Sequence, residues 1–147
     1  KFSINLENSK VLDLFSGVGS FGIEVLSRGA NYVTFVENYS NVLKILKKNI
    51  EILNLKNKCE IIEKDILIEL DFKKFEKKFD LIFLDPPFNE KKLSLIILNI
   101  YNSNILKKNG ILIIHRKSNV QDEFISKFNI IEEKKYGLSK IIFGHYF

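Results

Sequence analysis

The sequence predicts an α/β fold with a doubly wound, mostly parallel sheet of seven strands and an antiparallel C-terminal strand. Apolar runs rich in β-branched residues alternate with helical patterns, the order typical of parallel strands joined by right-handed crossovers. The last two runs have no helix between them, which predicts an antiparallel pair. With 147 residues, 46% of them hydrophobic, the chain is long enough for one compact domain over residues 1–147.

The expected elements follow from apolar periodicity and from turn residues. We expect strands at residues 10–15, 31–36, 60–64, 79–84, 111–114, 130–134 and 141–147. We expect helices at residues 22–28, 40–53, 91–103 and 120–128, and weak helical character at 66–75. Turns are expected at Asn109-Gly110 and at Tyr136-Gly137, and Gly29 stands where a helix C-terminal cap belongs.

Within the helix at 40–53, one face is expected to be apolar. Val42, Leu46, Ile50 and Leu53 recur at helical spacing, and Ser40 can cap the first turn. This face predicts packing against the sheet.

A glycine-rich turn follows the first strand. Gly17, Gly19 and Gly22 are spaced G-x-G-x-x-G between an apolar run and a helical pattern. Glycines let the backbone approach a ligand closely, and a helix N-terminus presents unpaired N–H groups. The turn therefore predicts a site for a nucleotide-like ligand, although this spacing also occurs by chance in loops.

Acidic residues close or nearly close four of the predicted strands. They are Asp13, Glu37, Asp65 and Asp85. A single strand-end acid is more often a solvated carboxylate or a helix cap, but four at the ligand-binding edge of a parallel sheet favour a site. Glu37 lies 20 residues after Gly17, the offset at which an acid can accept hydrogen bonds from ribose hydroxyls.

A second motif, Asp85-Pro86-Pro87-Phe88, follows the fourth predicted strand. Two prolines cannot continue a central strand, so a stiffened turn is one interpretation. The other is a site for a planar amine, where a carboxylate and a carbonyl both accept from one NH2 group and an aromatic ring stacks on the base. Such contacts suit group transfer to an exocyclic nitrogen.

Together these motifs resemble a known superfamily. Residues 11–19 are similar to motif I of class I S-adenosylmethionine-dependent methyltransferases, which have a Rossmann-like fold. Residues 85–88 are similar to the (D/N)PP(Y/F) motif of the members that methylate amines. Residues 22–30, 35–37, 79–85 and 135–137 resemble the RsmD family, which methylates guanine N2 in 16S ribosomal RNA.

The resemblance implies a set of cofactor-binding residues. Asp13, Ser16 and the Gly17–Gly19 turn would surround the methionine part of S-adenosylmethionine. Glu37 would hold the ribose. The residues expected around the adenine are Asn38, Asp65 and Ile66.

It also implies the residues that act on the acceptor. Asp85 and the Pro86 carbonyl would orient the guanine amine, and Phe88 would stack on the base. Transfer would be direct, with no covalent enzyme intermediate and no metal, and a paired guanine would have to be flipped out.

Other functions use parts of the same pattern. An adenine-N6 nucleic-acid methyltransferase or a protein-glutamine methyltransferase would also need a motif like residues 85–88. A nicotinamide-dependent oxidoreductase would use the glycines and Glu37 but gives no reason for Asp85 to Phe88. A non-catalytic module that binds S-adenosylmethionine is the remaining alternative.

Composition and family resemblance suggest the partners. A net charge of +5 suits a polyanion, and the resemblance implies ribosomal RNA or an assembling small subunit, in the cytoplasm or an organelle with bacterial-type ribosomes. We expect a monomer, no metal site and no membrane segment, because the histidines are distant and the longest apolar run is short. The chain has no methionine and is expected to lack the basic N-terminal extension of the family.

Two side-chain groups have unremarkable interpretations. Cys59 is the only cysteine, and we expect it to lie on a strand as an inert thiol. His115, Arg116 and Lys117 follow the fifth predicted strand, where a surface turn is favoured over contact with substrate phosphates.

Overall fold

The computed structural model describes residues 3–147, so the first two residues of the predicted domain lie outside the described part. The chain divides into two compact units, Lys1–Leu70 and Asp71–Phe147. The described residues form seven strands, three in the first unit and four in the second.

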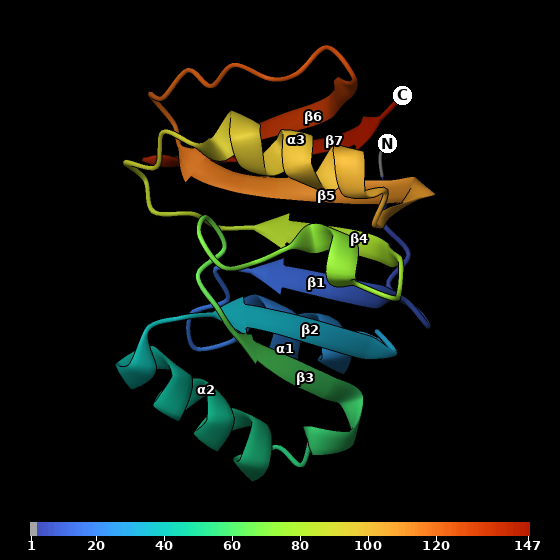
Figure 1. Cartoon of the computed structure of the whole chain (residues 1–147), viewed down its shortest axis with the longest axis vertical. Helices are drawn as coiled ribbons and strands as arrows, with labels where there is room; N and C mark the ends of the chain where they lie inside the picture. The colour runs from blue at the N-terminus through green and yellow to red at the C-terminus, as the bar shows by residue number, and fades with distance from the viewer. Residues whose placement is uncertain (1–2) are drawn as a thin grey trace. The chain divides into compact units, whose positions relative to one another are not determined.

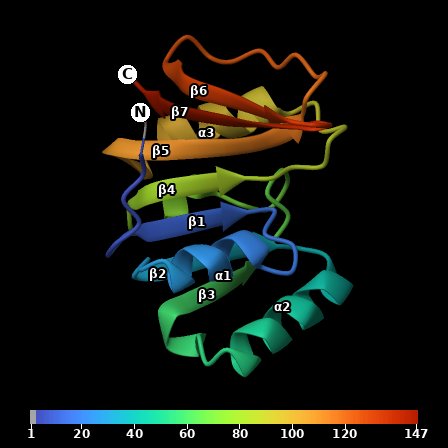
Figure 2. The same ribbon diagram turned by 180° about the vertical axis from the view of Figure 1, so that it is seen from behind.

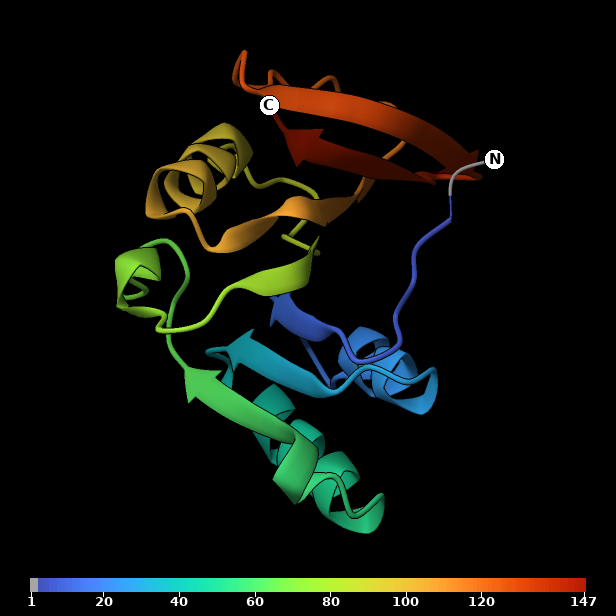
Figure 3. The same ribbon diagram turned by 90° about the vertical axis from the view of Figure 1, so that its right-hand side faces the viewer.

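The first unit is a parallel sheet with both of its α-helices on one face (Figures 2 and 3). Its elements are β1 (Lys10–Leu14), α1 (Ser20–Ser27), β2 (Tyr32–Glu37), α2 (Ser40–Ile52), the 3-10 turn Lys56–Lys58 and β3 (Cys59–Glu63). The strand order is β3-β2-β1, and all pairs are parallel (Figure 1). The carboxyl ends of the three strands therefore lie at one edge, where ligands bind in sheets of this type.

The core of this unit is the apolar middle of the sheet. Val11, Leu12 and Leu14 of β1 are fully buried, as the apolar run of this strand predicts. Gly29 follows α1 with a φ of 102°, which confirms the predicted glycine cap.

Helix α2 buries Leu43, Leu46 and Ile50. Leu46 and Ile50 confirm the predicted face, whereas Leu43 is buried in place of Val42, and Leu53 lies beyond the end of the helix and is exposed. Ser40 makes no side-chain cap, since Tyr39 holds the capping position.

The second unit holds the remaining strands. Its elements are the 3-10 turn Phe72–Lys74, β4 (Phe79–Leu84), α3 (Leu93–Ser103), β5 (Leu106–Lys117), β6 (Phe128–Tyr136) and β7 (Ser139–Tyr146). The order is β4-β5-β7-β6; β4 pairs with β5 in parallel, and β7 is antiparallel to both β5 and β6. The predicted α/β class, mostly parallel pairing and antiparallel C-terminal strand are confirmed.

The predicted helix at 120–128 is wrong. Residues 118–127 form turns and irregular backbone leading into β6. This segment is instead bound to β5 and β7. Asp122 pairs with Arg116 of β5, and Lys140 of β7 donates to the Val120 carbonyl oxygen at 2.7 Å. A helical pattern this short has little stability of its own, so these tertiary contacts prevail.

Two smaller expectations are also corrected. Residues 66–75 form a turn and a short 3-10 segment rather than a helix, because the Asp65 and Asp71 carboxylates bind backbone N–H groups just after them. Strand β5 begins at Leu106, so Asn109-Gly110 lies inside an irregular part of that strand rather than in a turn before it.

Candidate functional site

The glycine turn of the first unit is shaped by positive φ angles. Phe15, Gly17 and Gly19 have φ of 57°, 58° and 90°. The Ser16 N–H donates to the Val36 carbonyl oxygen at 3.0 Å, and the Gly19 N–H donates to the Ser16 carbonyl oxygen at 3.0 Å. The turn is thus tied to β2, and its φ angle at Phe15 is a strained value for a bulky residue.

The three glycines differ in what surrounds them. A Cβ on Gly19 or Gly22 would lie 2.5 Å from Leu46 Cδ1 or 2.2 Å from Phe35 Cε1, so these two glycines let α1 pack closely. A Cβ on Gly17 would meet nothing within 4 Å. Only Gly17 faces open space, as expected where a ligand approaches the backbone.

Asp13 is buried in β1, with 1% of its surface exposed. One of its oxygens, Oδ2, accepts a hydrogen bond from the Gly22 N–H at 3.1 Å. A carboxylate in this place stabilises the N-terminal turn of α1. Asp13 therefore links the first strand to the helix that follows the glycine turn.

The Glu37 carboxylate and the Gly17 backbone are brought together. Glu37 Oε2 accepts from the Gly17 N–H at 2.9 Å, while Oε1 accepts from the N–H groups of Asn38 at 2.8 Å and Tyr39 at 3.0 Å. Three backbone donors hold this buried carboxylate in one orientation at the carboxyl end of β2.

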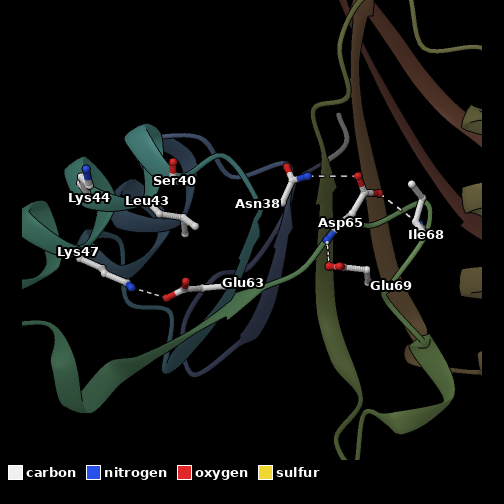
Figure 4. A pocket seen from close by; sticks show the side chains of 9 residues that line it. All are labelled: Asn38, Ser40, Leu43, Lys44, Lys47, Glu63, Asp65, Ile68 and Glu69. Atoms are coloured by element: carbon white, nitrogen blue, oxygen red, sulfur yellow. Dashed lines mark hydrogen bonds and ion pairs between the residues drawn. The ribbon is translucent and has the colours of Figure 1, made fainter.

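Asn38 and Asp65 meet beside this carboxylate. Asn38 Nδ2 donates to Asp65 Oδ2 at 3.1 Å, and Figure 4 shows the two side chains pointing toward one another. Asp65 Oδ1 accepts from the N–H groups of Leu67 and Ile68, which fixes the turn, and Ile66 is buried beside it. The same two side chains line a cavity of about 580 Å³. Its other lining residues are Ser40, Leu43, Lys44, Lys47, Glu63, Ile68 and Glu69.

The residues of the first unit fit the cofactor that the resemblance implies. Ser16 is buried, and its Oγ has no hydrogen-bond partner among the residues that the structure describes. A buried hydroxyl without a partner is costly unless a ligand supplies one. Together with the open space at Gly17, this hydroxyl offers a polar contact to a ligand on the glycine turn.

The loop of residues 85–88 follows β4 in the second unit, and we call it the acceptor loop for the role that the resemblance implies. Asp85 is half-buried, Pro86 is buried, and the Phe88 ring is 44% exposed. An accessible ring beside a partly exposed carboxylate is the arrangement that the amine-site interpretation requires.

Sequence reasoning missed the residues that hold this loop. His115 and Arg116 belong to β5, so the favoured surface turn at 115–117 is wrong. His115 Nδ1 lies 2.7 Å from Asp85 Oδ1, and the His115 ring contacts the Phe88 ring edge-on, with centroids 5.5 Å apart. No local signal marked these two residues, because the apolar run of β5 ends at Ile114 and residues 115–117 are polar.

Arg116 is a buried cation, with 2% of its side chain exposed. Its guanidinium pairs with Asp122 at 2.7 Å and donates to the carbonyl oxygens of Pro87 at 3.3 Å and Glu90 at 3.1 Å. Arg116 thus ties the acceptor loop to the irregular segment 118–127.

The remaining expectations concern isolated groups. Burial, and to a lesser extent the neighbouring Glu60, raises the pKa of the Cys59 thiol, which disfavours a reactive thiolate. Residues 3–147 contain no group of three or more His, Cys, Asp and Glu side chains able to hold a metal ion. In the same part of the chain, every helix is too short or too polar to cross a membrane.

Comparison with known proteins places the chain in a family. A family model described as "Conserved hypothetical protein 95" matches residues 2–145. Among solved structures, a conserved hypothetical protein of Streptococcus pyogenes has a TM-score of 0.85 at 28% identity, over 94% of this chain and 86% of that one. A putative methylase from Haemophilus influenzae, HI0767, has a TM-score of 0.82 at 30% identity, over 95% and 87%.

Two curated relatives carry the name "Ribosomal RNA small subunit methyltransferase D". The one from Buchnera aphidicola subsp. Acyrthosiphon pisum is 36% identical over 92% of this chain and 65% of its own length. The one from Haemophilus influenzae is 32% identical over 90% of this chain and 69% of its own length. The chain therefore belongs to the family of this model, the RsmD family, and spans about two thirds of the length of these two relatives.

Proposed function

We propose that the protein methylates an exocyclic amine of ribosomal RNA with S-adenosylmethionine, and that this amine is guanine N2 in 16S ribosomal RNA. The observation that carries the proposal is the acceptor loop, where Asp85, Pro86 and Phe88 offer a carboxylate, a carbonyl and an accessible ring. The curated names of two relatives support ribosomal RNA as the substrate.

The first unit supplies the proposed cofactor contacts. Ser16 and Gly17 lie against the methionine part, with Asp13 holding α1 in place behind the turn. Glu37 accepts from the ribose hydroxyls through the lone pairs that its three backbone bonds leave over. Asn38, Asp65 and Ile66 contact the adenine. When bound, S-adenosylmethionine supplies an electrophilic methyl group on a sulfonium sulfur.

The second unit supplies the proposed acceptor contacts. The Asp85 carboxylate and the Pro86 carbonyl oxygen accept hydrogen bonds from the two N–H groups of the amine. These bonds draw the nitrogen lone pair out of conjugation with the base, while stacking on Phe88 holds the base plane. Positioning and preorganised acceptors of this kind supply most of the rate enhancement in a direct transfer.

The test is a labelling experiment with defined acceptors. The purified protein is incubated with methyl-labelled S-adenosylmethionine and, separately, with immature small ribosomal subunits, naked DNA or a release factor. Label in 16S ribosomal RNA that digests to N2-methylguanosine is the expected result. Label in N6-methyladenine, in DNA alone or in protein alone would overturn the guanine assignment, and tight NAD binding without S-adenosylmethionine binding would overturn the cofactor.

Replacement of Glu37 by glutamine is expected to weaken S-adenosylmethionine binding by roughly 10- to 100-fold, because charge-assisted hydrogen bonds to the ribose are worth about 1.5–3 kcal/mol. Glutamine keeps an acceptor for part of the backbone contacts, so folding is largely retained. Calorimetric titration measures the dissociation constant. The matched control is Glu51→Gln, on α2 of the same unit, whose exposed carboxylate pairs with Lys56 and for which no change in affinity is expected.

The glycine turn allows a paired comparison. Gly17→Ala is expected to fold, at a cost of about 1–2 kcal/mol for the left-handed conformation, and to bind S-adenosylmethionine more weakly because its methyl group fills the open space. Gly22→Ala is expected to lower the free energy of unfolding by about 1–3 kcal/mol, because its Cβ would overlap Phe35. Thermal unfolding and calorimetry separate the two effects, and equal affinities for Gly17→Ala and the unchanged protein would contradict the role of the turn.

A further inference from the structure

We propose that His115 is a positioning residue that fixes how the Asp85 carboxylate and the Phe88 ring are oriented relative to each other. This proposal rests on the proposed function, because it assigns His115 to the same acceptor loop. The glycine turn and the Asp85-to-Phe88 motif contain no histidine, so these motifs assign no role to His115.

His115 is attached to a rigid part of the second unit. It lies in β5, which pairs with β4 on one side and with β7 on the other, and His115 itself is paired with Ile141. The preceding pair, Leu84 with Ile114, is where β4 ends and the acceptor loop begins (Figure 1). A strand paired on both sides holds a side chain more accurately than a loop does.

One imidazole ring contacts both functional side chains of the loop. Its Nδ1 is 2.7 Å from Asp85 Oδ1, and its ring lies edge-on to Phe88 at an interplanar angle of 75°. With the proton on Nδ1, the histidine donates to Oδ1, and none of the described residues donates to Oδ2. The carboxylate is therefore turned so that Oδ2 remains for the substrate amine.

His115 and its neighbour Arg116 differ in how much of their side chains is buried. The Arg116 side chain is 2% exposed and binds loop carbonyl oxygens, whereas the His115 side chain is 25% exposed and contacts the groups proposed to touch the substrate. Arg116 determines whether the loop is held, and His115 determines how its two functional side chains are oriented.

The two contacts can be removed one at a time. His115→Asn retains a side-chain N–H at the position of Nδ1 and removes the ring that meets Phe88. His115→Phe retains a ring and removes the hydrogen bond to Asp85. His115→Ala removes both, and Lys117→Ala, on an exposed residue of the same strand, is the matched control.

We expect His115→Phe to lower kcat roughly 10- to 100-fold with little change in KM for the RNA, because the amine is misdirected. His115→Asn is expected to keep kcat within a few-fold and to raise KM several-fold, because the Phe88 ring is less well placed. His115→Ala should show both effects. Three variants with the same kinetic change, or three with no change, would overturn the proposal, as would losses that follow only the loss of thermal stability.

A second measurement separates this proposal from the proposed function. Nitrogen-15 NMR of the histidine ring detects the Nδ1–H proton and its hydrogen bond in the unchanged protein and in Asp85→Ala. A hydrogen-bonded Nδ1–H that is lost in Asp85→Ala supports the pair even if no RNA is methylated, in which case only the proposed function fails. A ring that Asp85→Ala does not affect overturns the positioning role whatever the activity.

Discussion

Replacement of Arg116 by methionine is expected to lower the free energy of unfolding by about 3–5 kcal/mol. Its guanidinium is buried and pairs with Asp122, whose side chain is 8% exposed. Methionine fills much of the same volume but leaves that carboxylate buried without a cation. The Glu90 carbonyl oxygen also loses the guanidinium N–H, and the Pro87 carbonyl oxygen keeps only the Glu90 N–H. Chemical denaturation monitored by circular dichroism measures the loss.

Two further variants test the cause of this loss. Arg28→Met removes an ion pair with Glu24 in which both side chains are more than half exposed, and is expected to cost no more than about 1 kcal/mol. Adding Asp122→Leu to Arg116→Met removes the unpaired charge and should restore much of the stability. Similar losses for Arg116→Met and Arg28→Met would show that burial of the pair is not what matters.

Replacement of Asp85 by alanine is expected to lower the rate of methyl transfer by roughly 10²- to 10³-fold, the effect of removing one preorganised polar group from a reacting centre. The substrate amine loses its ionised acceptor, so its lone pair stays conjugated with the base. The residues proposed to bind S-adenosylmethionine belong to the first unit, so its dissociation constant should stay within about two-fold. Single-turnover kinetics measures the chemical step, and calorimetry measures the binding.

Asp80→Ala is the matched control for this prediction. Asp80 lies on β4 of the same unit, and its carboxylate pairs with Lys107 in an exposed ion pair. The same substitution there should leave the transfer rate unchanged. A rate for Asp85→Ala within a few-fold of the control would refute the role of the acceptor loop.

The parts of the molecule that follow local rules could be predicted from the sequence. Strands β1 and β2 are largely apolar runs, and Gly29 and Gly137 stand where positive φ is needed, so these strands and turns were placed within a few residues. The placement of Glu37 and the glycine turn at one edge of the sheet could also be predicted, because their spacing spans one strand–helix–strand unit.

What could not be predicted depends on pairs of residues distant in the sequence. The segment 120–128 has helical spacing, yet Asp122 binds Arg116 and the chain leaves the helical conformation. His115 pairs with a residue 30 positions earlier in the sequence. Neither contact changes the local pattern of apolar residues. The register of β4 against β5 brings His115 to Asp85, and the path of the irregular segment 118–127 brings Asp122 to Arg116.

The three backbone bonds to Glu37 have a consequence for turnover. Backbone N–H groups of the chain already fill much of the hydrogen-bonding capacity of this carboxylate. A ribose therefore adds hydrogen bonds to a charge that is already stabilised. Each ribose hydroxyl then contributes a modest gain, at the low end of the about 1.5–3 kcal/mol of a charge-assisted hydrogen bond. If the proposed function holds, the demethylated product carries the same ribose as S-adenosylmethionine. A modest affinity for that sugar then lets the product dissociate and a new S-adenosylmethionine bind rapidly between successive turnovers.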